Sequence, residues 1–380
     1  MSIARKLLPL CLALLSGNSA LAQRSGILLG MTATSTNPEG DTQTFDTIHA
    51  PTFQTMWIAS DSKGELKVLA SLPELVVPRK DGFWHAGVLQ LCEFDGDLLG
   101  ATGGNERILQ TVWTAPVGKA ATIELRHPCV AHQPEDYAPP YGRSEQDQHK
   151  ISQCGFALVN LLYVSPELIS MSTYNGQSED CEARGGHYEV TFKVQTFDSD
   201  DALSFGQLFG HPAHDAYLRA LLSHGTSDFG GECGESDASF DTGWRIAHES
   251  GKWRPYVHQN LGYFGCVADA PIKFPIPVSF TGDPSAVDWQ SLHTKIPDLT
   301  DAYLSPARDL LIAVSAANMR IFELRAGVPG KLLLTLPASR IVMAQWATGT
   351  HVQDWTTKIF EFAHQPVAEP AVQVTSRVKE

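Results

Sequence analysis

His187-Tyr-Glu-Val-Thr-Phe-Lys-Val-Gln-Thr-Phe197 alternates between apolar and polar side chains along most of its length. On an extended chain the two kinds fall on opposite sides: Tyr188, Val190, Phe192 and Val194 on one, and Glu189, Thr191 and Lys193 on the other. Such alternation is typical of an antiparallel strand with one face buried and the other in solvent. This stretch therefore predicts a fold in which antiparallel sheets dominate.

Further strands are expected on both sides of this stretch. Residues 53–59 and 66–69 flank an Asp61-Ser-Lys-Gly64 turn, which is typical of a β-hairpin. Towards the C-terminus, short strands are expected at residues 310–314, 319–324, 331–336 and 340–346. Helices are expected at 212–224, which Gly225 ends, and at 352–362. We therefore predict a β-rich α+β fold: antiparallel sheets with one or two packed helices, stapled by disulfides.

One phrase indicates a different arrangement of the same strands. Leu304-Ser-Pro-Ala-Arg-Asp-Leu-Leu-Ile-Ala-Val314, continued by Phe322-Glu-Leu324, resembles a single repeat of a β-propeller. A propeller has at least four blades, and the phrase does not occur four times in this chain. A β-propeller-like fold is therefore kept as the alternative.

The first 22 residues have the pattern of a secretory signal peptide. Arg5 and Lys6 precede an apolar run, and Ala20 and Ala22 supply the small side chains that signal peptidase needs. The run is shorter than the roughly 20 residues that span a bilayer. We therefore expect cleavage after Ala22, a periplasmic or secreted location, and no stable membrane insertion.

Composition bounds the partners and the organisation of the chain. The net charge of −14 disfavours binding to the phosphates of nucleic acid. With 380 residues the chain exceeds one comfortable core. The expected parts after the leader are a flexible lead-in (23–50), a β-rich subdomain (51–130), a linker or long loop (131–150), an α+β subdomain (151–300), a β-rich C-terminal segment (301–364) and a disordered tail (365–380).

Cysteine usage agrees with export. Cleavage would remove one of the seven cysteines and leave six: Cys92, Cys129, Cys154, Cys181, Cys233 and Cys266. An even number in an exported chain favours disulfides, and no Cys-x-x-Cys indicates a metal site. Among the possible pairings we expect the sequential one, 92–129, 154–181 and 233–266, because each bridge then closes a local loop.

Two regions carry possible metal ligands. His211-Pro-Ala-His214-Asp215 places two imidazoles and a carboxylate within one helical turn, a spacing that could hold Zn²⁺. The loop 225–243 offers carboxylates for Ca²⁺ without the order of a calcium-binding loop: Asp228, Glu232, Glu235, Asp237 and Asp241. An exposed helix start and a solvated acidic loop explain these residues as well. No cofactor is therefore predicted, and Ca²⁺ or Zn²⁺ stays open.

Trp244, Trp253 and Tyr256 are the candidate ligand-binding side chains, because exposed aromatic rings can stack on sugar rings. Core packing is the competing interpretation for all three. The nearest approach to a hydrolase motif is Gly225-Thr-Ser-Asp-Phe229, in which Phe229 occupies the place of the second glycine. No catalytic residue is assigned, and the interpretation leans against an enzyme.

Residues 162–210 resemble a known exported module. The phrases that carry the resemblance are Ile169-Ser-Met-Ser-Thr-Tyr-Asn-Gly176, Gly185-Gly-His187 and Leu203-Ser-Phe-Gly-Gln-Leu-Phe-Gly210. They are similar to the extracellular domain of lysozyme-sensing anti-sigma factors, which also precedes certain peptidoglycan deacetylase domains. Gln207 stands where that family has the Asp of its LxDLF phrase. The resemblance implies a helix packed on an antiparallel sheet and a cell-envelope setting, and it transfers no catalytic residue.

Two functional hypotheses follow. The first is an exported cell-envelope or secreted binding module that recognises a protein or a cell-wall glycan. The second is a hydrolase acting on an envelope polymer, with an acid/base pair from residues 211–241 such as His214 or Asp228. A carboxylate or histidine with a shifted pKa in a cleft would favour the second. The missing catalytic motifs favour the first.

Overall fold

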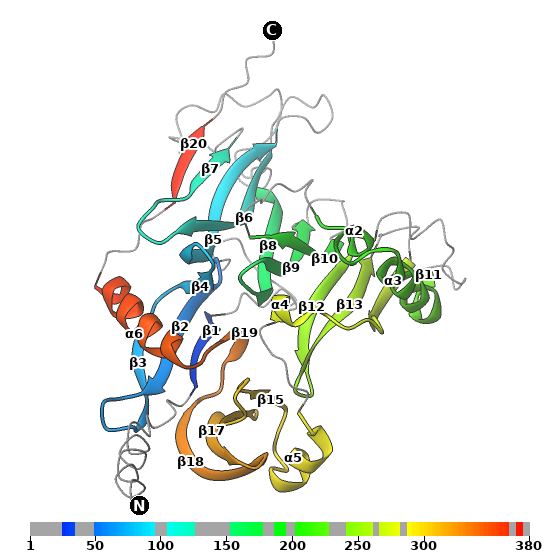
Figure 1. Ribbon diagram of the computed structural model, residues 1–380. Helices are drawn as coiled ribbons and strands as arrows, with labels where there is room; N and C mark the ends of the chain where they lie inside the picture. Colours follow the sequence, from blue (N-terminus) through cyan, green and yellow to red (C-terminus); the bar gives the residue numbers. More distant parts are fainter. Residues whose placement is uncertain are drawn as a thin grey trace, which may run out of the picture.

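The computed structural model describes ten segments of the chain: residues 25–34, 49–95, 105–125, 153–177, 186–194, 202–227, 241–260, 266–281, 287–364 and 370–374. Four sheets, which we number blades 1 to 4, surround a common centre as in a four-bladed β-propeller (Figure 1). The prediction of a β-rich, mainly antiparallel fold is confirmed. The strands form the ring that the sequence analysis kept as its alternative.

Blade 1 joins the two ends of the described chain. Its strand order is β19 (Arg340–Ala347), β1 (Gly26–Thr34), β2 (Thr52–Ser60) and β3 (Leu66–Leu72). β1 pairs antiparallel with both β19 and β2, so an N-terminal strand lies beside a C-terminal one. Residues 26–34, expected within a flexible lead-in, are thus a buried central strand, because their apolar run packs on both faces.

Blade 2 has six strands: β10 (Gly186–Lys193), β9 (Leu168–Gln177), β8 (Gln153–Val164), β6 (Asn105–Pro116), β5 (Gly82–Asp95) and β4 (Leu75–Arg79). All of its pairings are antiparallel except that between β6 and β8. The expected linker, residues 131–150, lies outside the described residues.

Blades 3 and 4 are antiparallel and four-stranded. Blade 3 consists of β11 (Thr226–Ser227), β14 (Cys266–Pro271), β13 (Lys252–Asn260) and β12 (Trp244–Glu249). Blade 4 consists of β15 (Asp301–Leu304), β16 (Leu310–Val314), β17 (Asn318–Arg325) and β18 (Val328–Pro337). The phrase that resembles a propeller repeat spans the first three strands of blade 4.

Five helices are described: α2 (Phe205–Phe209), α3 (His211–His224), α4 (Val278–Thr281), α5 (Trp289–Lys295) and α6 (Thr350–Ala363). α3 packs on β13 and β14, and α6 packs on β2, β3 and β19. Both expected helices are therefore confirmed. None of these helices is long and apolar enough to cross a membrane. In the expected tail, β20 (Ala371–Val374) pairs with β7 (Thr122–Leu125).

The ring corrects one prediction about the alternating stretch. Its polar side was expected to face solvent, but Glu189 is only 6% exposed and Thr191 is fully buried. The hydroxyl of Thr191 donates a hydrogen bond to the carbonyl of Trp244 at 2.9 Å. Glu189 and Thr191 are buried because β10 packs against β12 and β13 of blade 3, whereas Lys193 at the end of the strand is exposed, as expected.

Candidate functional site

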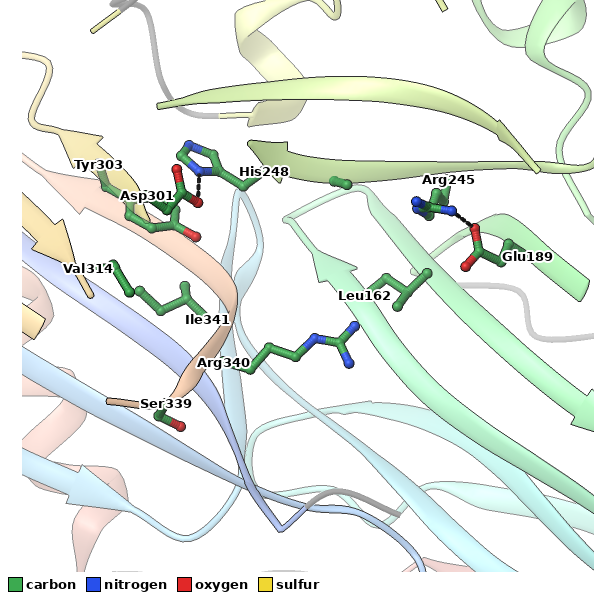
Figure 2. A pocket seen from close by; sticks show the side chains of 11 residues that line it. Leu162, Glu189, Arg245, His248, Asp301, Tyr303, Val314, Ser339, Arg340 and Ile341 are labelled. Carbon is green, nitrogen blue, oxygen red and sulfur yellow. Dashed lines mark hydrogen bonds and ion pairs between the residues drawn. The ribbon is translucent and has the colours of Figure 1, made fainter. Parts of the chain in front are cut away.

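A cavity of about 380 Å³ lies at the centre of the ring (Figure 2). All four blades contribute to its lining: Arg340 and Ile341 from blade 1, Leu162 and Glu189 from blade 2, Arg245, Ala247 and His248 from blade 3, and Asp301, Tyr303 and Val314 from blade 4, together with Ser339 just before β19. Its size falls in the range of small-ligand sites, roughly 300–1,000 Å³. Charged side chains from all four blades converge in it: Arg340, Glu189, Arg245 and Asp301.

Glu189 and Arg245 form a buried ion pair on one side of the cavity. Arg245 also lies 3.1 Å from Asp269, and its guanidinium stands over the ring of Tyr256 at 4.9 Å. His258 Nδ1 lies 3.4 Å from the same Glu189 oxygen. The pair thus bridges β10 and β12, and Arg245 is held by two carboxylates.

The pKa values show that burial disfavours the charged form of Glu189 more than that of Arg245. Burial raises the pKa of Glu189 to about 6, although the charge of Arg245 opposes this. The pKa of Arg245 is raised by Glu189 and Asp269, which outweigh its own burial. The charged form of Glu189 is disfavoured because the carboxylate has lost almost all contact with water. The charged form of Arg245 is favoured because it gains two anionic partners. Glu189 is therefore a carboxylate with a shifted pKa in a cavity.

Arg340 enters the same cavity from the first residue of β19 and extends toward Glu189 and Arg245 (Figure 2). Among the described residues, none forms an ion pair or a side-chain hydrogen bond with it. Arg340 is exposed, and the pKa of its guanidinium is lowered mainly by the protein packed around it, although the Glu189 carboxylate opposes this. Arg340 is thus an exposed cation close enough to Glu189 to feel its charge, and no ion pair of its own is described.

His248 and Asp301 form a second pair, which joins blades 3 and 4. Nδ1 of His248 lies 2.6 Å from a carboxylate oxygen of Asp301, whose other oxygen accepts from the backbone N–H of Gly251 at 2.9 Å. The imidazole stacks on Tyr303 at 3.9 Å between ring centres and meets Trp253 at 4.5 Å. Only 3% of the His248 side chain is exposed. Because Tyr303 and Trp253 cover the imidazole, the pair of His248 and Asp301 is a buried contact that holds blades 3 and 4 together.

The three predicted aromatic residues have different environments, and none lines the cavity. Trp244 is fully buried, and its indole N–H donates to the carbonyl of Leu203 at 2.6 Å. Trp253 packs against Tyr163 at 4.6 Å between ring centres. Tyr256 is half-buried, donates to Glu249, and has its pKa raised to about 12, mainly by burial. Trp244 is therefore a core residue.

The predicted metal ligands at the start of α3 do not converge on one point. His211 and Asp215 form an exposed pair at 3.3 Å, whereas His214 Nδ1 lies 2.9 Å from Asp241. Asp241 also accepts from the backbone N–H of Gly206 at 2.7 Å, so it fastens α3 and α2 to the start of blade 3. No group of three or more His, Cys, Asp or Glu in the described part of the chain could hold a metal ion.

Several predicted residues lie outside what the structure describes. Asp228, Glu232, Glu235 and Asp237 belong to the segment 228–240. The same holds for Cys129, Cys181 and Cys233, and for the side chains of Cys92, Cys154 and Cys266. The disulfide prediction and the calcium loop therefore stay predictions.

The cavity residues themselves were missed in the sequence. Glu189 was assigned to a solvent-facing side, and neither Arg245 nor Arg340 belongs to a recognisable motif. Glu189 itself was a usable signal, because it is the one carboxylate among the residues of the alternating strand. If such a strand is buried on both faces, its carboxylate must be buried with a partner, which predicts a buried cation nearby.

Comparisons with known proteins leave the site unassigned. No protein-family model matches the chain, and no curated protein matches it. A crystal structure of a protein from Lactobacillus plantarum is similar at 8% identity and a TM-score of 0.11, covering 79% of this chain. The match spans 55% of that protein's own length.

Proposed function

We propose that this chain is an exported binding module of the cell envelope or the extracellular space, whose central cavity receives an anionic group of its ligand. The pattern of the first 22 residues supports export, and the resemblance of residues 162–210 supports an envelope setting. The observation that carries the binding role is Arg340, an exposed cation that lines a cavity of about 380 Å³ and for which no ion pair is described.

The charges around the cavity indicate which charge the ligand carries. Glu189 and Asp269 neutralise Arg245, and Asp301 is engaged with His248. For Arg340 no ion pair is described, although the Glu189 carboxylate acts on it electrostatically. A guanidinium binds carboxylates and phosphates through paired N–H donors. One carboxylate or phosphate beside Arg340 would therefore complete the site. The carrier of that group is a protein or a cell-wall glycan.

Anion titration of the variant Arg340→Gln tests this proposal. Inorganic phosphate and succinate are the probes, and thermal unfolding is the readout. A ligand at about 100 times its Kd stabilises a protein by roughly 2.7 kcal/mol. A hydrogen-bonded charge contributes about 1.5–3 kcal/mol, so the variant should bind at least tenfold more weakly. Arg219→Gln, on the exposed face of α3, removes the same charge as a control. Equal responses of wild type and Arg340→Gln would refute the proposal.

A hydrolase is the second candidate, and one observation favours it. Glu189 has a pKa of about 6 and lines a cavity, which is the environment of a general acid. Its position differs from the 211–241 region in which the acid/base pair was expected. In this case Glu189→Gln would abolish release of reducing ends from peptidoglycan while binding persists. Absence of turnover by the wild type would leave the pair with Arg245 as the role of Glu189.

A further inference from the structure

A second cavity opens on the outside of the ring, between α6 and the turn that joins β4 and β5. Its volume is about 800 Å³, and it shares no lining residue with the central cavity. Blade 1 supplies its floor through the end of β19, and the turn between β8 and β9 contributes Pro166 and Glu167. We call this cavity the α6 groove.

Gln345 is the unusual residue of the α6 groove. It is 6% exposed, and no described group forms a hydrogen bond with its buried amide nitrogen. Its neighbours along that side of β19, Met343 and Ala347, belong to an apolar core cluster. A buried amide without a partner destabilises the folded state, because it has lost its hydrogen bonds to water. Because Gln345 lines the α6 groove while this nitrogen is buried, a rotation of the amide would turn an unpaired donor toward a group that enters.

Aromatic side chains stand beside this amide. Trp355 of α6 is half-buried, with its ring 5.7 Å from both Trp57 and Phe83. The indole N–H of Trp57 donates to Thr356 at 3.0 Å, which fixes this turn of α6 on blade 1. Trp355 is thus held rigidly from the core side, while part of its surface lines the α6 groove.

The charges of the α6 groove cancel. Its cationic side chains are Arg79, Lys80 and Lys358, and its acidic ones are Asp81, Glu167 and Asp354. Arg79 is already engaged, at 3.4 Å from Asp81 and at 4.6 Å over the ring of Trp84. A balanced set of charges gives an anion no preference for this groove, in contrast to the central cavity. An uncharged polar ligand suits it.

From these features we infer that the α6 groove binds an uncharged sugar residue of a glycan, with Gln345 bonded to its hydroxyl or amide oxygen and Trp355 against its ring. A sugar presents both requirements at once, because its ring has an apolar C–H face and its edge carries hydrogen-bonding groups. The inference stands independently of the anion site, because it rests on different residues.

Calorimetric titration of the full chain with maltotetraose, cellotetraose and the tetramer of N-acetylglucosamine tests this inference. At least one sugar should bind the wild type, and Gln345→Leu should weaken that binding tenfold or more. The unliganded Gln345→Leu protein should also unfold at a higher urea concentration than the wild type. Gln353→Leu makes the same chemical change at an exposed position of α6 outside the groove, and should leave affinity unchanged.

Three results would overturn the inference: no binding of any of these sugars, unchanged affinity in Gln345→Leu, or a lower urea midpoint for that variant. The last would mean that Gln345 has a structural partner. Arg340→Gln should leave sugar affinity unaltered. The sugar site is thus tested by Gln345→Leu and the anion site by Arg340→Gln, so the failure of one proposal can be distinguished from the failure of the other.

Discussion

The buried ion pair between Glu189 and Arg245 makes a quantitative prediction about stability and pH. Burial raises the pKa of Glu189 from 4.5 to about 6. The difference, about 1.5, corresponds to about 2 kcal/mol of free energy. Because the folded-state value is the higher one, the folded protein binds this proton more tightly than the unfolded chain does. Its contribution is fully present below pH 4.5 and is lost as the pH rises through 6.

The perturbation is Glu189→Gln, which removes the titration while keeping the size of the side chain. Free energies of unfolding of wild type and variant, from urea denaturation between pH 4 and 7.5, give a difference profile. The wild type should lose about 2 kcal/mol relative to the variant across this range. The constant offset between the two proteins cancels from the slope, so the lost ion pair with Arg245 does not obscure the result.

Asp298→Asn is the control of sign. The guanidinium of Arg320, 2.6 Å from Asp298, lowers the pKa of this exposed carboxyl. Here the wild type should gain stability relative to the variant as the pH rises toward and just past 3.8, so the denaturations of this pair begin at about pH 2.5. A flat profile for Glu189→Gln, or one of the same sign as for Asp298→Asn, would show that Arg245 compensates the burial of Glu189 fully, and the electrostatic reasoning about the cavity would be refuted.

Two further predictions concern the architecture. Trp244→Phe removes the indole N–H bonded to Leu203 and leaves a cavity in a fully buried site, so we expect a loss of about 2–4 kcal/mol in urea denaturation. Gly26→Ala places a Cβ 2.5 Å from the ring of Trp57 where β1 and β2 meet, so a loss of about 1–3 kcal/mol is expected from the same assay. Wild-type stability of either variant would contradict the packing described here.

Local signals in the sequence predicted the local elements. The hairpin of β2 and β3 follows from its strands and from Gly64, whose φ of +78° suits the glycine of a turn. α3 follows from helical periodicity and from the stop at Gly225. Closure of the ring has no local signal, because it depends on residues from opposite ends of the chain. Ile27 pairs with Trp346, and the backbone N–H of Ser25 donates to Asp309 at 2.7 Å.

The site escaped prediction for a related reason. Alternation reports which side chains are polar, but it does not report where the polar side points. In an open sheet the side of β10 that carries Glu189 would face water, whereas in a ring it meets the next blade. The propeller phrase occurs only once because the four blades differ in sequence. Only the blade geometry recurs, and even that varies, since blade 2 has six strands rather than four.

The strand that closes the ring has a special place in the functional argument. β19 begins at Arg340 in the central cavity and carries Gln345 in the α6 groove. If β19 only closed the ring, apolar or hydrogen-bonded side chains at both positions would make the fold more stable. Gln345 instead holds a buried amide nitrogen without a described partner, at a cost to stability, and Arg340 presents an exposed cation to the cavity. Such costs are found where a protein trades stability for function, so β19 is where ring closure and ligand binding meet.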